Sequence, residues 1–206
     1  MEIRELSLIN QKVYESFIPN IDNSALMAEL NIFYANVTAK LKDTYDWNMR
    51  FPDAGPESEK LKEEIKIRVN TVAGKQMDCR EFWMFSMKNG GSVPRHNHKT
   101  NYQLHPEEYY SIVYYPLSPT GAANLNFIGS YCNTMESSIS VKSESGKLII
   151  FNSFLDHYTD RHLVDAERVC ISANYKPSEP DKSLVSDWTR FAKPGVAEDT
   201  GLSKFS

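Results

Sequence analysis

The sequence has no long apolar run, few cysteines and little excess charge. No stretch reaches the roughly 18 apolar residues of a transmembrane helix, and the first residues lack the charged start and apolar core of a secretory signal. We therefore expect no membrane-embedded segment and a cytoplasmic location. The three cysteines, Cys79, Cys132 and Cys170, are odd in number and widely spaced, which argues against a disulfide framework and against a zinc ribbon.

The charge balance gives little support for a nucleic-acid partner. The chain has 23 lysines and arginines against 27 acidic residues, for a net charge of -4, and no basic stripe. We therefore expect a small-molecule substrate and no nucleic acid.

The length of 206 residues suits one domain. We divide it into a helical support over residues 1–75, a β core over 76–176 and a C-terminal tail over 177–206. Trp188 and Phe191 in this polar tail are expected to pack on the core or on a second copy. The second arrangement would give a homodimer.

Two amphipathic helices are expected before the strands. Between residues 24 and 41 apolar side chains recur every three or four positions, which traces one stripe of a helix. A second helix is expected over 57–72, because Pro56 and early acidic residues suit a helix start and apolar residues follow at intervals of four. Both stripes are expected to cover one face of a sheet.

After Gly74 the chain consists of short β-prone runs separated by Gly, Pro, Asn and Ser. Six such runs are residues 81–87, 109–115, 124–128, 137–141, 147–151 and 168–175. Together with segments near 96–98 and 157 they make about eight strands. This spacing predicts a mainly β fold, a sandwich or barrel, rather than βαβ units.

An H-x-H pair follows the Gly90-Gly91 turn. Alternate residues of an extended segment point to the same side, so His96 and His98 share a face while Asn97 points away. Two imidazoles aimed at one point indicate a metal site. In isolation the same pair is also compatible with two polar residues that face water.

His157 lies 59 residues after His98, following a buried run and a turn, and Arg168 lies eleven residues further on. His157 is either a third ligand or a hydrogen-bonded core histidine. Strand alternation places Arg168 on a polar face with Cys170, Ser172 and Asn174. If the helices cover the opposite, apolar face, a buried Arg168 requires an anion such as a ligand carboxylate. Otherwise it pairs with an acidic residue at the surface.

Four segments carry a family resemblance: 83–98, with its Trp, Lys, Gly and H-x-H; 112–115; 146–157; and 168–174, which reads R-V-C-I-S-A-N. Over roughly residues 60 to 176 the sequence resembles the Fe(II) and 2-oxoglutarate-dependent oxygenases, within them a small bacterial and phage group. The resemblance implies a double-stranded β-helix, the jelly-roll or cupin-like barrel, with the two N-terminal helices packed on its sheet.

The resemblance also implies a cosubstrate and a metal. Fe(II) would be held by His96 and His157, and 2-oxoglutarate would chelate it, with O2 as the second cosubstrate. Arg168 would bind the distal carboxylate through two parallel, charge-assisted hydrogen bonds. We assign Ser172, Asn174 and Tyr114 to the same cofactor pocket.

One position departs from the family pattern, because His98 stands where an acid is usual. His98 can itself be the third ligand, which we favour. Alternatively Glu107 or Glu108 completes the triad and His98 orients a ligand, or no iron-activating site exists. His105 and His162 are interpreted as solvent-facing or as neighbours of the ligands.

Three functions follow from these residues. The leading one is hydroxylation of a small-molecule or amino-acid-type substrate with release of succinate and CO2, where Tyr102, Tyr110 and Tyr114 are candidates for the pocket lining or for core packing. The second is a three-histidine cupin dioxygenase that acts on a thiol without 2-oxoglutarate. The third is a cupin that binds a metal without catalysis.

Overall fold

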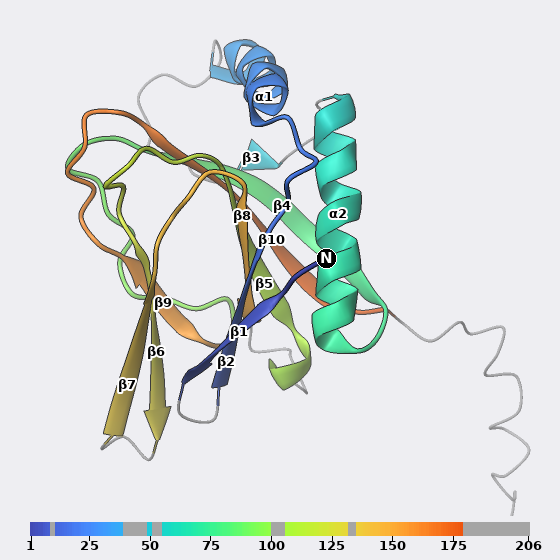
Figure 1. Ribbon diagram of the computed structural model, residues 1–206, viewed down its shortest axis with the longest axis vertical. Helices are drawn as coiled ribbons and strands as arrows, with labels where there is room; N and C mark the ends of the chain where they lie inside the picture. The colour runs from blue at the N-terminus through green and yellow to red at the C-terminus, as the bar shows by residue number, and fades with distance from the viewer. Residues whose placement is uncertain (9–10, 39–48, 51–54, 100–105, 132–134, 179–206) are drawn as a thin grey trace, which may run out of the picture.

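Two antiparallel sheets face each other in the computed structural model, which describes residues 1–8, 11–38, 49–50, 55–99, 106–131 and 135–178 (Figure 1). Within these residues one sheet has seven strands in the order β1-β2-β8-β5-β10-β4-β3, and the other has three in the order β7-β6-β9. The expected mainly β architecture, a jelly-roll of the double-stranded β-helix type, is confirmed.

The elements have the following bounds. The strands are β1 (Arg4–Leu8), β2 (Gln11–Phe17), β3 (Met49–Arg50), β4 (Met77–Met87), β5 (Tyr110–Leu117), β6 (Leu125–Tyr131), β7 (Met135–Val141), β8 (Lys147–Asn152), β9 (Asp156–Thr159) and β10 (Arg168–Pro177). The helices are α1 (Asn23–Thr38), α2 (Pro56–Ala73) and the short 3-10 helix η1 (Pro106–Glu108).

The large sheet has a different environment on each face. On β10, Val169, Ile171 and Ala173 pack in the cluster that the helices cover. The alternate residues, Arg168 and Ser172 among them, line a cavity between the two sheets. The predicted division of this strand into an apolar face under the helices and a polar face inside the barrel is therefore correct.

Both helices lie against the same face of the large sheet (Figure 1). The α2 stripe of Leu61, Ile65 and Val69 is fully buried, and each such side chain contributes about 1.5–3 kcal/mol relative to an exposed one. The helix ends at Gly74, whose φ of 66° is the left-handed conformation that glycine adopts without a steric cost. The observed helix, 56–73, extends the expected one by a residue at each end.

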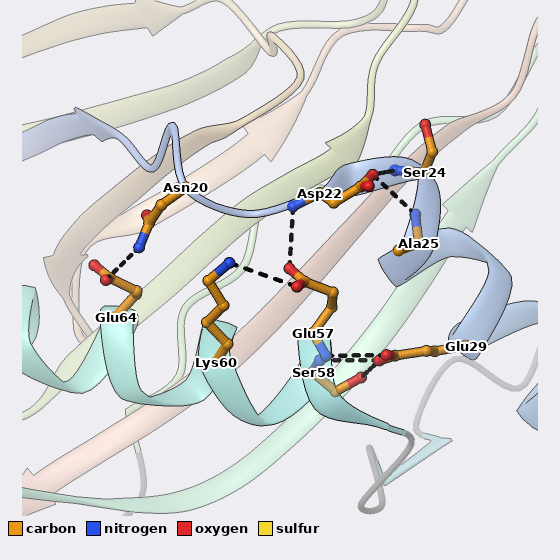
Figure 2. A network of polar contacts seen from close by, with 9 residues as sticks. All are labelled: Asn20, Asp22, Ser24, Ala25, Glu29, Glu57, Ser58, Lys60 and Glu64. Carbon is orange, nitrogen blue, oxygen red and sulfur yellow. Dashed lines mark hydrogen bonds and ion pairs between the residues drawn. The ribbon is translucent and has the colours of Figure 1, made fainter.

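The two helices cap each other at their N-termini (Figure 2). The N-cap position of α2 is Gly55, which has no side chain to accept a hydrogen bond. The Glu29 carboxylate of α1 takes that role, accepting the backbone N–H of Glu57 at 2.9 Å and both the N–H and the hydroxyl of Ser58 at 2.9 and 2.7 Å. In return, Glu57 accepts the N–H of Asp22, the residue before α1, at 3.0 Å.

The helical support predicted for residues 1–75 is incomplete, because β1 and β2 precede the helices. β2 pairs with β8 over Val13 to Phe17 and so extends the large sheet. Only Val13 and Ser16 of β2 are buried, so the strand has too weak an alternation to stand out in the sequence. No helix in the described ranges is long and apolar enough to cross a membrane.

Replacing Glu29 with alanine should lower the free energy of unfolding by about 1–2 kcal/mol, because the first turn of α2 loses the acceptor for three hydrogen bonds. Urea denaturation of the full chain measures the change. Glu59→Ala is the matched control: Glu59 is exposed and pairs only with Lys62 on the same helix, and its loss should cost under about 0.5 kcal/mol. Equal effects of the two substitutions would contradict the capping role.

Candidate metal centre

The segment that carries H-x-H runs antiparallel to the segment that carries His157. The chain leaves β4 through Gly90, whose φ of 86° allows the turn, and Gly90 N–H donates to the carbonyl of His162 at 2.7 Å. Further on, His96 and His157 exchange both backbone hydrogen bonds, at 3.0 and 2.9 Å. This pairing places the two ligand segments directly opposite each other.

Three histidines meet inside the barrel at this pairing. The ring centroids of His96 and His157 are 4.3 Å apart, those of His96 and His98 5.3 Å, and those of His98 and His157 5.1 Å. One nitrogen from each lies within 4.8 Å of the others. His96 is the most exposed of the three and His157 is buried. Among the described residues no other group of histidine, cysteine and acidic side chains is arranged in this way.

Backbone carbonyls orient two of the rings. The Nδ1 of His96 lies 2.8 Å from the carbonyl of Pro94, and the Nδ1 of His157 lies 2.9 Å from the carbonyl of Leu155. Nδ1 must carry a proton to make these bonds, so in the neutral form of each ring the lone pair is on Nε2. A metal-ligating histidine is held in the same way, with one nitrogen donating and the other free to bind.

The pKa values of two of the three histidines also favour metal binding. Burial lowers the pKa of His157 to about 3, and burial together with the charge of nearby His96 lowers the pKa of His98 to about 4. Both imidazoles are therefore neutral at pH 7, which is the form that binds a metal ion.

A polar clamp joins the same two segments on the outer side. Asn97 points away from the histidines and donates to Asp156 Oδ1 at 2.7 Å, while Arg95 donates to Asp156 Oδ2 at 2.8 Å. Burial alone would raise the pKa of Asp156, but these hydrogen bonds outweigh it and the pKa is lowered. The charged carboxylate thus holds H-x-H in register with His157 from outside.

Arg168 is buried in the same cavity and forms no ion pair with any acidic residue in the described part of the chain. Its side chain is 1% exposed. The Tyr115 hydroxyl accepts from Nη2 at 3.1 Å, and the Tyr115 ring lies 4.7 Å from the guanidinium carbon. Burial raises the pKa of Tyr115 to about 12, so the phenol is neutral. The Arg168 Nε is the one buried side-chain nitrogen or oxygen in the described residues with no hydrogen-bond partner. A ligand carboxylate would satisfy both the charge and this N–H.

The cavity that connects these groups has a volume of about 520 Å³. The three histidines and Arg168 lie in its wall, together with the predicted Ser172 and Asn174. Asn174 donates to Glu81 at 2.6 Å and accepts from Ser111 at 2.6 Å. Glu81 is the single carboxylate among the described lining residues, and it lies by Asn174, six residues or roughly 20 Å along β10 from Arg168.

Three tyrosines, Tyr114, Tyr110 and Tyr102, were candidates for the pocket lining. Tyr114 is wrong as a pocket residue: it faces the helices and its hydroxyl donates to Asn23 at 2.7 Å. Its neighbour Tyr115 faces the cavity side and contacts Arg168, a role that the sequence analysis missed. Tyr110 packs against the helix-side cluster and lines a second, separate cavity. Tyr102 lies outside the described residues.

The acidic alternatives are not brought to the histidines. Glu108 forms an ion pair with Lys75 at 2.6 Å, and Glu107 lines the second cavity. His162 was expected at the surface or beside the ligands, but it is fully buried and its ring bonds to the backbone of Ala123 and Ala166. His105 and the tail residues Trp188 and Phe191 lie outside the described residues.

Comparisons with known proteins agree with this geometry. The model of a family described as putative 2OG-Fe(II) oxygenase matches residues 81–174, a range that includes all three histidines and Arg168. No curated protein matches the chain at a significant level. The family match confirms the resemblance drawn from the sequence and the expected class of 2-oxoglutarate-dependent non-haem enzymes.

Solved structures confirm the fold. AviO1 from Streptomyces viridochromogenes is 13% identical with a TM-score of 0.62, and the match covers 82% of this chain and 91% of AviO1. The α-ketoglutarate-dependent carbocyclase SnoK from nogalamycin biosynthesis is 10% identical with a TM-score of 0.63, covering 92% and 90%. HygX from Streptomyces hygroscopicus, with nickel and 2-oxoglutarate bound, is 14% identical with a TM-score of 0.54, covering 80% and 82%.

Replacing His96, His98 or His157 individually with alanine should weaken Ni(II) binding at least about 100-fold, because each substitution removes one of three convergent ligands. Isothermal titration of the metal-free chain measures the affinity. Glu107→Ala is the control and should bind Ni(II) as the wild type does. Retained affinity in His98→Ala with loss in Glu107→Ala would reverse the ligand assignment.

Proposed function

We propose that this chain, whose residues 81–174 match the 2OG-Fe(II) oxygenase family, is a non-haem Fe(II) and 2-oxoglutarate-dependent oxygenase. The proposal rests on the residues that line one cavity. This cavity holds three convergent histidine nitrogens and, in the same wall, a buried arginine whose Nε has no hydrogen-bond partner among the described residues. A metal and a dicarboxylate are the two ligands that such a pair of features fits.

Different residues would bind the metal and the cosubstrate. His96, His98 and His157 would hold Fe(II), and three protein ligands on one face leave positions for a cosubstrate and O2. Arg168 would grip the distal carboxylate of 2-oxoglutarate, with Tyr115 keeping the guanidinium in place. When bound, Fe(II), 2-oxoglutarate and O2 together supply the oxidising power for hydroxylation, and 2-oxoglutarate leaves as succinate and CO2.

The wall of the cavity indicates what else the chain contributes. The ring of Phe151 lies 4.8 Å from that of His157, edge to face, and Phe127 lies 6.0 Å from His157 on the side of the small sheet. These rings exclude water from His157, the buried member of the three histidines. Trp83, Phe85 and Val93 add apolar lining, so the space left for a substrate suits a small organic molecule or an amino-acid-type compound.

A second candidate function is supported by His98. A set of three neutral imidazoles leaves the metal one unit more positive than a set with a carboxylate. Such a site also suits a thiol dioxygenase that needs no 2-oxoglutarate, in which Arg168 would bind the carboxylate of the substrate itself. Oxygen uptake that depends on a thiol and not on 2-oxoglutarate would favour this function.

The test is 2-oxoglutarate turnover by the iron-loaded chain. Anaerobic addition of Fe(II) and 2-oxoglutarate should give a weak visible band that needs both, and oxygen should then release succinate. Arg168→Ala should raise the 2-oxoglutarate concentration needed for half-maximal turnover at least tenfold, since a hydrogen bond to a charged group contributes about 1.5–3 kcal/mol.

The control for that substitution is Arg80→Ala, which removes an exposed arginine of β4 that does not line the cavity. It should leave the 2-oxoglutarate dependence unchanged. Iron binding with no spectral or kinetic response to 2-oxoglutarate would reject the proposed function.

A further inference from the structure

His98 is held differently from the other two histidines. Its ring stacks with two other rings: that of Trp83, at 5.4 Å and 24° between planes, and that of His157, at 5.1 Å and 13°. Within the described part of the chain the His98 ring forms no hydrogen bond, whereas the Nδ1 atoms of His96 and His157 each meet a carbonyl. Among the described residues, the restraint on this ring is therefore ring stacking.

Both partners in the stack have fixed backbones. Trp83 lies in β4, which is paired with β10 on one side and with β3 on the other. Its neighbours Phe82 and Met84 are buried under the helices, so strand alternation directs Trp83 into the cavity. The backbone N–H of His98 donates to the carbonyl of Ser153 at 2.8 Å. The indole is thus presented to the imidazole by the rigid sheet.

We propose that Trp83 is a positioning residue of the metal centre, one that orients the His98 ring and stabilises the charge this ring shares when it binds the metal. The inference rests on the metal centre proposed above. A metal-bound imidazole carries part of the positive charge of the ion, and the face of an indole is negative, so the stack is stronger in the metal-bound state than in the metal-free state.

This role accounts for the histidine at position 98, where an acid is usual. A carboxylate ligand would offset one charge of the metal directly, and an imidazole cannot. The face of Trp83 provides part of that compensation without a ligand bond. The substitution of an imidazole for an acid and the tryptophan on the facing strand therefore form one functional unit.

Ni(II) affinity of the full chain without 2-oxoglutarate tests the proposal. Trp83→Leu should weaken Ni(II) binding roughly tenfold, the range of a partly desolvated cation–π contact. Trp83→Phe keeps an aromatic face and should recover much of the loss. In a His98→Ala background, Trp83→Leu should have no further effect, because the two residues act through one contact. Additive losses in that background would overturn the proposal.

A spectroscopic measurement covers the case in which Trp83→Leu does not fold. In a Trp47→Phe, Trp188→Phe chain, excited where only tryptophan absorbs, the remaining emission comes from Trp83, and Ni(II), an open-shell ion, should quench it in step with binding. Binding without quenching would overturn the contact. Failure of the wild-type chain to bind Ni(II) at all would instead reject the metal centre itself, so the two failures are distinguishable.

Discussion

The antiparallel pairing of residues 90–98 with 156–162 is the constraint on which the site depends. It consists of the reciprocal backbone bonds of His96 and His157, and it is closed on the outer side by the bonds from Asn97 and Arg95 to Asp156. Because the pairing links segments some 60 residues apart in sequence, it brings H-x-H and the third histidine to one point. A shift by one residue would turn every ligand to the outer face.

The second determinant is the buried charge of Arg168. Arg168 cannot lose its proton, and it is buried beside a neutral phenol rather than a carboxylate. A protein that gains nothing from such a group would pair it or expose it. In the proposed function a ligand carboxylate offsets the cost of this burial, and Arg168 shares one cavity with the histidine cluster.

The parts of the fold that were predicted correctly share a strong local pattern. The α2 stripe and the alternation of β10 are each set by the period of a single element against one apolar layer. The N-terminal strands β1 and β2 were missed because they extend a sheet edge, where few of their side chains are buried, and β2 joins the sheet by pairing with β8. Pairing between distant segments leaves little trace in local periodicity.

The sequence alone determined which residue types could form the site: the spacing of His96 and His98, the position of Arg168 in an alternating strand, and the family resemblance that follows from them. The tertiary structure decided which aromatic residues serve it. Tyr115 rather than Tyr114 meets Arg168, because Tyr114 pairs with Ile171 on the helix-covered face and alternation turns Tyr115 to the opposite side. Trp83 stacks on His98. Such contacts depend on strand register and on facing sheets, which are properties of the assembled chain rather than of any one segment.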